Sequence, residues 1–322
     1  MKSSPLLLLV LTAALAIPLQ ALGADELAAT RIVVGYPPGG GADGLARAYA
    51  QAMSKTLRHP VIVENRPGAG GTLAAVAVKT APADGTVLLL GNILTNVLAE
   101  FTYEKLPYDA KADFVPVGQA ARLEIAMAVP PGSAARTVAD YVAAAKADPD
   151  NASFASPAAG SLPHFFGLLL GRAAGVALMH VPYKGGAPMN MDLMAGRVPA
   201  AFSAASEFVQ LHRTGRVRML ATSGDTRDAQ TPDVPTFAEA GYPTVHGSSW
   251  LALFAPAGMR LETLARMAAA VEAASADPEV RGAIDNLNME YPNVSLAAFG
   301  PQIEEERRRW GAIVKASGFK AD

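Results

Sequence analysis

The sequence predicts an α/β fold in which a parallel sheet is covered by helices. Two observations predict it. Short β-branched segments alternate with segments of helical periodicity, and glycine-rich turns join them in the order strand, turn, helix. The chain has 322 residues, 51% of them hydrophobic and 17% charged, which is enough for two domains with a core each. This composition also excludes an intrinsically disordered chain.

The first part of the chain repeats the strand–turn–helix unit. A β-branched strand ends at Pro37-Pro38-Gly39-Gly40-Gly41, and apolar residues then recur at helical spacing from Leu45 to Leu57. A second strand follows Pro60, and the glycine turn from Gly68 to Thr72 opens another helix. We expect strands at 31–36, 61–63 and 87–90, and helices at 45–57 and 72–79.

The same alternation continues beyond residue 120. Thr137 with Asp140 and Thr236 with Glu239 have the spacing of helix caps. In the last helix, Glu304 and Arg308 are spaced for an ion pair on a solvated face, which we favour over a catalytic carboxylate cluster. We expect strands at 125–129, 178–181, 200–202, 217–222 and 250–255, helices from 137 and at 162–173, 188–195 and 236–239, and two or three helices at the end.

Residues 1–23 have the pattern of a secretory signal peptide. Lys2 provides the positive charge, Leu6 to Ile17 is an apolar run, and Ala21-Leu22-Gly23 is a small-x-small cleavage pattern. The apolar run is shorter than a membrane-spanning helix needs, although an uncleaved N-terminal anchor is the alternative. The sequence has no Cys, so a periplasmic protein that requires no disulfides is predicted.

Several classes of site are missing from the sequence. A formal charge of −2 provides no basic surface for nucleic acid, and we predict no nucleic-acid partner. The five His residues have no metal-binding spacing, and neither a G-x-S-x-G nor a P-loop motif occurs. Ser161 and His164 have no orienting acid near them in the sequence. We therefore predict no metal, no cofactor, no catalytic residue and no enzyme activity.

The glycine turns allow more than one interpretation. Both precede helices, so their backbone N–H groups and the helix N-termini can bind an anion at the carboxyl edge of the sheet. Gly39, Gly41 and Gly44 also match G-x-G-x-x-G, with Glu64 after the next strand, so an exported NAD(P)-dependent oxidoreductase is the alternative. A third interpretation is that the glycines serve turns and helix packing only.

Four motifs, in order along the mature chain, resemble those of one family. The chain is similar to the Bug solute receptors of tripartite tricarboxylate transporters, which are TctC-like periplasmic proteins. The motifs are Tyr36 to Asp43 with Ala46-Arg47; Glu64 to Gly71; Tyr183 to Gly186 with Asp192-Leu193, Gly196 and Val198; and Asp233 to Thr236 with Glu239 to Pro243.

The resemblance implies a type II periplasmic-binding-protein fold, in which two α/β lobes joined by two crossovers close on a ligand. With crossovers near residues 124 and 247, lobe 1 comprises 24–124 and 247–322, and lobe 2 comprises 125–246. The family implies a small carboxylate between the lobes as ligand, delivery to membrane transporter subunits, a periplasmic location and a monomer.

The resemblance also implies the ligand-binding residues. His164 could instead cap or pack, Lys184 could be an ion-pair partner, and Asp192 is expected to organise the Lys184 loop. The first wall comprises Tyr36, Gly39, Gly40, Asp43, Gly70, Gly71, Thr72, Asn92 and Thr95; the second comprises Ser156, Gly160, Ser161, His164, Tyr183, Lys184, Gly185 and Ser203.

Position 203 departs from the pattern of many relatives. They carry an acid after the Phe of this strand, whereas this chain has Ser203 after Phe202. An acid there could pair with an ammonium group. Its absence predicts a preference for carboxylates without an ammonium group.

Overall fold

The computed structural model describes residues 29–321, so the predicted signal peptide lies outside the described residues. Within this range, no helix combines the length and the apolar composition needed to span a membrane. The strands are β1 Thr30–Val34, β2 Val61–Asn65, β3 Val87–Asn92, β4 Phe114–Val129, β5 Ser153–Ser156, β6 Met179–Pro182, β7 Ala201–Ala204, β8 Arg218–Thr222 and β9 Ser248–Pro256. The α-helices are α1 Gly41–Leu57, α2 Thr72–Lys79, α3 Ala99–Thr102, α4 Val138–Ala147, α5 Leu162–Ala174, α6 Gly186–Met194, α7 Ala205–Arg213, α8 Leu261–Ser275, α9 Pro278–Asn286 and α10 Leu296–Ser317.

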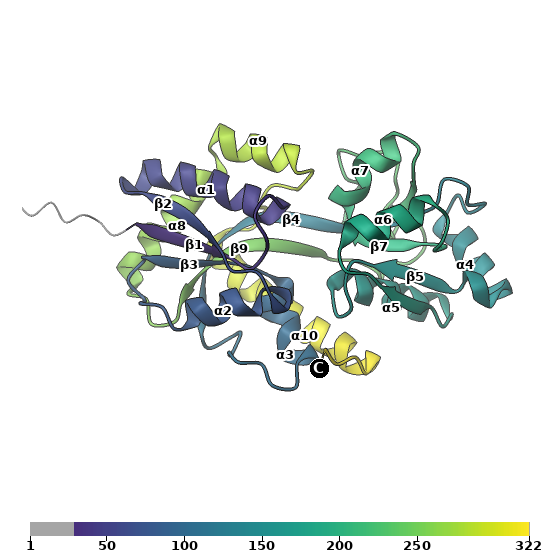
Figure 1. The fold of residues 1–322 in the computed structure, drawn as a ribbon, viewed down its shortest axis with the longest axis horizontal. Helices are drawn as coiled ribbons and strands as arrows, with labels where there is room; N and C mark the ends of the chain where they lie inside the picture. The colour runs from purple at the N-terminus through teal and green to yellow at the C-terminus, as the bar shows by residue number, and fades with distance from the viewer. Residues whose placement is uncertain (1–28, 322) are drawn as a thin grey trace, which may run out of the picture.

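The nine strands form two sheet regions that share β4 (Figure 1). The first sheet has the order β2-β1-β3-β9-β4, and the second has β4-β7-β5-β6 with β8 also paired to β4. β4 pairs with β9 as far as Glu124 and with β7 from Ile125 onward, so it changes sheets between these two residues. β9 begins at Ser248 and returns the chain to the first sheet.

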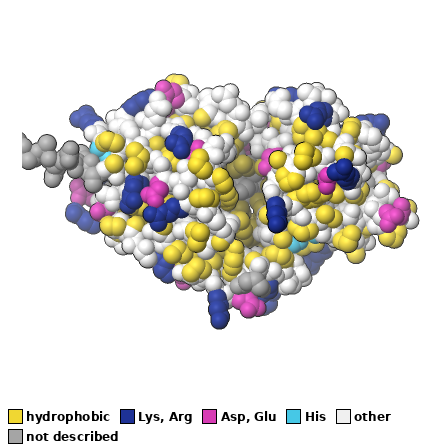
Figure 2. Space-filling view, viewed as in Figure 1, with side chains coloured by type: hydrophobic (Ala, Val, Ile, Leu, Met, Phe, Trp, Pro, Cys, Tyr) yellow, Lys and Arg dark blue, Asp and Glu magenta, His cyan; other side chains and the backbone are white. Residues whose placement is uncertain are grey.

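The strand directions bring two sets of carboxyl ends to the junction between the sheets. β1, β2 and β3 are parallel, and Asn92 at the end of β3 pairs with Leu251 near the start of β9. β5, β6 and β7 are also parallel, and Ala204 at the end of β7 pairs with Ile125, where β4 enters the second sheet. Both sets therefore end at the groove that separates the two halves of the molecule in Figure 2.

Helices cover both faces of the first sheet. α1, α8 and α9 pack on one face, where Ile32, Leu45 and Met267 belong to one buried cluster. α2, α3 and α10 cover the other face, as Figure 1 shows. The cluster on that face continues into the second sheet, because Trp310 of α10 lies 5.5 Å from Phe166 of α5 between ring centroids. α10 thus contacts both halves of the molecule.

The structure confirms most predicted elements, but several differ. β4 starts at Phe114, eleven residues before the predicted strand, and β5, α3 and α7 were not predicted. The predicted helix at 236–239 is wrong: Thr236 and Glu239 form the reciprocal capping bonds, but the chain makes only a turn before Gly241 and Pro243.

The charged face of α10 also differs from the prediction. The i,i+4 pair between Glu304 and Arg308 does not form, because Arg308 pairs with Glu305. Glu306 accepts a hydrogen bond from Trp250 Nε1 at 2.6 Å, and Arg307, whose side chain is 12% exposed, pairs with Glu100. This face therefore anchors α10 to the rest of the molecule.

Candidate functional site

On the first sheet's side of the groove, Tyr36, Gly71, Asn92 and Thr95 gather from three different turns. Asn92 Nδ2 donates to the Tyr36 hydroxyl at 2.5 Å, and the Thr95 backbone N–H donates to Asn92 Oδ1 at 3.0 Å. A Cβ at Gly71 would lie 2.8 Å from Thr95 Cγ2 and 4.0 Å from the Tyr36 hydroxyl. The turn before α2 therefore approaches this polar cluster closely because residue 71 has no side chain.

Asp43 organises the first glycine turn. Its Oδ2 accepts from the Gly39 N–H at 3.0 Å and from Arg47 Nε at 2.9 Å, and its Oδ1 accepts from Asn65 Nδ2 at 2.9 Å. Asp43 is buried, and the hydrogen bond from Arg47 is the main reason why its pKa falls to about 2. The carboxylate is therefore ionised at neutral pH and fixes Gly39 and Gly40 in front of α1.

The second glycine turn leads directly into α2. Gly70 and Gly71 both have positive φ angles, 64° and 99°, and Thr72 is the first residue of the helix. The Gly71 N–H donates to the Gly68 carbonyl at 2.9 Å and the Thr72 N–H donates to the Ala69 carbonyl, so these two donors hold the turn. The other first N–H groups of α1 and α2 have no partner within their helices, and the positive dipole ends of both helices point to the carboxyl edge of the sheet. This arrangement is suited to an anion.

Across the groove, two histidines support the turn after β5. His164 and His180 stack with 3.8 Å between ring centroids, and burial lowers the pKa of each to about 4. His164 Nδ1 accepts from the Gly160 N–H at 3.1 Å, and His180 Nε2 lies 2.7 Å from Ser156 Oγ. Both rings are neutral at pH 7, and they act on the site by holding this turn.

Ser156 and Ser161 are also occupied by local hydrogen bonds. Ser156 is fully buried, and its Oγ donates to the Ala158 carbonyl at 2.9 Å. Ser161 Oγ donates to the same carbonyl at 2.6 Å. In this structure both hydroxyls therefore order the turn between β5 and α5.

The turn after β6 carries Tyr183, Lys184 and Gly185. The Tyr183 hydroxyl donates to Asp192 Oδ2 at 2.8 Å, and Asp192 also pairs with Arg197 at 2.7 Å. The Gly185 N–H donates to the Pro157 carbonyl at 2.8 Å, which ties this turn to the one after β5. Lys184 is exposed. As expected from the sequence, Asp192 organises this turn.

The structure adds one residue that the sequence reasoning missed. Ser203 is buried, and its Oγ donates to Glu207 Oε2 at 2.8 Å. Glu207 lies in the first turn of α7, directly after β7, and its side chain is accessible to solvent. An acid is therefore present beside position 203, four residues later in the chain, and the i,i+4 spacing across the strand–helix junction was the signal that could have indicated it.

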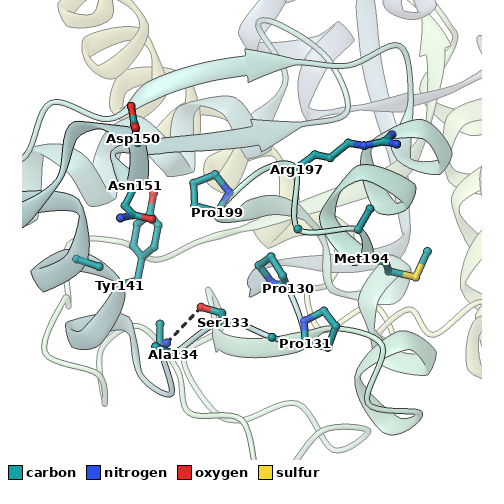
Figure 3. A pocket seen from close by; sticks show the side chains of 15 residues that line it. Pro130, Pro131, Ser133, Ala134, Tyr141, Asp150, Asn151, Met194, Arg197 and Pro199 are labelled. Carbon is teal, nitrogen blue, oxygen red and sulfur yellow. Dashed lines mark hydrogen bonds between the residues drawn. The ribbon is translucent and has the colours of Figure 1, made fainter.

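A large cavity elsewhere in the second half contains none of the predicted site residues. Its volume is about 700 Å³, and Pro130, Tyr141 and Arg197 are among the residues that line it (Figure 3). It lies beside Pro130, just past the end of β4, whereas the groove lies where β4 enters the second sheet. The predicted residues instead follow the carboxyl ends of β1, β2, β3, β5, β6 and β7.

Comparison with known proteins identifies the family. The sequence profile described as "Tripartite tricarboxylate transporter family receptor" (TctC) matches residues 45–319. The chain belongs to this family. A curated relative from Pseudomonas sp. (strain P51), "UPF0065 protein in tcbD-tcbE intergenic region", is 35% identical over 283 residues, which is 88% of this chain and 84% of the relative.

Solved structures agree with this assignment. MatC from Rhodopseudomonas palustris with bound malate is 31% identical, with a TM-score of 0.77, and the match covers 89% of this chain and 99% of MatC. R. palustris Rpa4515 with adipate is 30% identical, with a TM-score of 0.80, and the match covers 90% and 97% of the two chains. The periplasmic binding protein BugD is 27% identical, with a TM-score of 0.77 and coverage of 91% and 98%.

The TctC-family chain therefore has a type II periplasmic-binding-protein fold and is a solute-binding receptor, not an enzyme. The alternative of an oxidoreductase also conflicts with the geometry. Asp43 occupies the Gly39 N–H that a pyrophosphate would need. Glu64, the proposed ribose ligand, is paired with Arg31 at 3.0 Å and Arg66 at 2.5 Å.

Proposed function

We propose that this receptor captures a small carboxylate between two lobes and delivers it to the membrane subunits of a tripartite tricarboxylate-type transporter. The observation that carries the proposal is that the carboxyl ends of both sets of parallel strands meet at one groove. Open α/β sheets bind their ligands at such edges. The similar proteins MatC and Rpa4515, solved with malate and adipate, support a carboxylate as the ligand class.

In this proposal, the carboxylate binds to those N–H groups of the first sheet's glycine turns that have no partner in the chain; the Gly39 and Gly71 N–H groups, which donate to Asp43 and to the Gly68 carbonyl, hold the turns in shape. Gly39, Gly40 and Asp43 shape one turn, and Gly70, Gly71 and Thr72 the other. Tyr36, Asn92 and Thr95 supply side-chain polar groups beside them. Ser156, Gly160, Ser161, His164, Tyr183, Lys184, Gly185 and Ser203 form or support the opposite wall.

The lobes of the proposal are residues 24–124 with 247–322, and residues 125–246. Ser223 joins the two connections between them: its Oγ accepts from the Ile125 N–H at 2.9 Å and donates to the Gly247 carbonyl at 2.5 Å. A ligand that contacts both lobes stabilises the closed form, because only differential affinity shifts such an equilibrium. The proposal further includes that a cleaved signal peptide at residues 1–23 directs export of the protein. In the periplasm the protein then works as a monomer and presents its closed form to the transporter.

Gly40 provides the sharpest test of the anion site. It caps α1 with φ −81°, and a Cβ there would come no closer than 3.7 Å to the Pro37 carbonyl oxygen, so a side chain fits. Gly40→Asp adds a negative charge at the proposed site and also supplies a good helix cap. We expect the melting temperature to be kept or slightly raised while carboxylate affinity falls at least about tenfold, since like charges repel in a partly desolvated site.

The measurement is calorimetry with malate, succinate and adipate, on protein purified from the periplasm. Gly40→Asn is the neutral, nearly isosteric control, and Gly132→Asp places the same charge at a glycine whose Cβ would have nothing within 4 Å, beside the cavity in Figure 3. Both controls should bind as the wild type does. Equal affinity in Gly40→Asp and wild type would overturn the anion site, and binding of NAD(P) but of no carboxylate would overturn the proposed function.

A further inference from the structure

Glu207 is placed at the edge of the second sheet that faces the groove. It follows β7 by three residues, and its Oε2 accepts the Ser203 hydroxyl proton at 2.8 Å. A Cβ at Gly186 would lie 2.1 Å from the same oxygen, so the carboxylate reaches the start of α6. The Glu207 carboxylate therefore lies at the carboxyl ends of the second sheet's parallel strands, near the starts of α6 and α7, on the edge that faces the groove.

Glu207 differs from Asp43 and Asp192, the acids of the turns described above, because it has no cationic partner. Asp43 pairs with Arg47 at 2.9 Å, and Asp192 pairs with Arg197 at 2.7 Å. Within residues 29–321, no Lys, Arg or His nitrogen lies within 4.0 Å of the Glu207 carboxylate. Lys184, the basic residue nearest to Gly186 in sequence, forms no ion pair in the described part of the chain either.

An unpaired carboxylate on one wall of a closing groove needs a hydrogen-bond donor when water leaves. Charge-assisted bonds from a hydroxyl or an ammonium group are strong, whereas a methyl group leaves the carboxylate unsatisfied and a second carboxylate repels it. Ser203 satisfies only one lone pair of one oxygen, and a carboxylate has about four such positions. A ligand donor can therefore bind Glu207 while Ser203 holds it in place.

We propose that Glu207 is a specificity-determining residue, selecting carboxylates that carry a hydroxyl or ammonium group at the end remote from the glycine turns. This inference rests on the proposed function, since the glycine turns must hold the ligand's carboxylate first. From Ser203, the sequence predicted a preference for ligands without an ammonium group. The inference replaces that prediction, because Glu207, four residues later, supplies the acid that position 203 lacks.

The test uses ligands that differ only at the remote end. For each chain length from propionate to hexanoate, the unsubstituted acid, the ω-hydroxy acid, the ω-amino acid and the dicarboxylate of equal carbon number are titrated by calorimetry. The proteins are wild type, Glu207→Gln and Glu262→Gln. Glu262 is the matched control, because it also lies in the first turn of a helix but pairs with Arg260 at 3.1 Å.

At one chain length or more, wild type should bind the ω-amino or ω-hydroxy acid at least about tenfold more tightly than the unsubstituted acid. Glu207→Gln should lose most of this preference, more for the amino than for the hydroxy acid, because the Gln side-chain oxygen still accepts a hydrogen bond but carries no charge to pair with the ammonium group. The same variant should gain affinity for the dicarboxylate, and Glu262→Gln should match wild type.

Three outcomes would overturn the inference. The first is that wild type prefers the unsubstituted acid or the dicarboxylate at every chain length. The second is that Glu207→Gln keeps the wild-type preference for the ω-amino or ω-hydroxy acid. The third is that Glu262→Gln loses this preference as much as Glu207→Gln does. In each of these the protein still binds carboxylates, so the proposed function stands. If wild type binds no member of any set, and malate and adipate also fail, the proposed function is overturned together with the inference. Circular dichroism and melting temperature verify that each variant is folded.

Discussion

Gly71 is constrained by both its backbone conformation and its neighbours. Its φ of 99° is rarely adopted by residues with a side chain, and a Cβ would lie 2.8 Å from Thr95 Cγ2. We expect Gly71→Ala to lower the free energy of unfolding by about 1–3 kcal/mol, the usual cost of such strain, and to disturb the contact with Thr95. Urea denaturation of the periplasmic protein measures this change.

Gly132→Ala is the matched control for this prediction. Gly132 has no positive φ, and its Cβ would have no neighbour within 4 Å, so the same substitution should change stability little. Equal stability of the two variants would contradict the predicted strain. Because of this strain, Gly71→Asp would change charge and backbone conformation together, whereas the comparison of Gly40→Asp with Gly40→Asn isolates the charge.

At the scale of elements, the sequence predicted those whose periodicity is regular. α1, α5 and β9 lie within a few residues of the predicted ranges. The first half of β4 was missed because Pro116 and Gly118 interrupt the strand pattern, and its pairing with β9 shifts register at two irregularities. β5 was missed because it has only four residues, Ser153–Ser156, and depends on neighbouring strands for its definition.

The contact between α5 and β6 depends on keeping two imidazoles uncharged. His164 and His180 stack with pKa values of about 4, below the 6.5 expected in the unfolded chain, because burial disfavours the charged form. The unfolded chain therefore binds more protons between pH 6.5 and 4, and folding stability is lost as pH falls through this range. The loss is up to about 1.4 kcal/mol per pH unit for each ring.

His180→Phe tests this linkage. The variant keeps an aromatic ring against His164 and Phe154 and removes one titrating group, along with the contact to Ser156. We expect a less stable protein at pH 7 whose stability falls less steeply between pH 6.5 and 4 than that of wild type. Urea denaturation over this range measures the slopes, and parallel curves for the two proteins would argue against neutral, buried imidazoles.

At the scale of the whole molecule, the sequence predicted the candidate site's backbone better than its side chains. Glycine turns after parallel strands are visible in a sequence, because strand ends and helix starts define them. The bond between Ser203 and Glu207 is local, at i,i+4 spacing, but it forms only across a strand–helix junction that was not predicted. The approach of Glu207 to Gly186 depends on how β6, β7 and two helices pack, which periodicity does not encode. The sequence-based prediction therefore gave a wall without an acid.

The segment where β4 changes sheets contains an unusual carboxyl group, Glu124. It is 6% exposed, and its Oε2 has no hydrogen-bond partner. Burial, followed by the nearby charge of Glu290, raises its pKa above the ordinary value of 4.5. Glu124 lines a cavity together with Asp225 and Asp228 from the loop after β8, so further negative charges lie near it. Arg122 partly offsets these charges by pairing with Glu290 at 3.2 Å.

A raised pKa means that the folded protein holds this proton more tightly than the unfolded chain does. The stabilising contribution is therefore complete below about pH 4.5 and is lost as pH rises through the folded-state pKa.

Glu124→Gln keeps the shape of the protonated acid and cannot ionise. We expect the melting temperature of wild type to fall more between pH 5 and 9 than that of Glu124→Gln, with the two proteins most alike at pH 5. Differential scanning calorimetry across this range measures the difference, with Glu262→Gln as the exposed control that should follow wild type. Glu124 is the last residue of β4 to pair with β9. If the melting temperatures of wild type and Glu124→Gln diverge only at high pH, the ionising group lies at this connection between the two sheets. If the two curves stay parallel, Glu124 is already ionised in the folded protein.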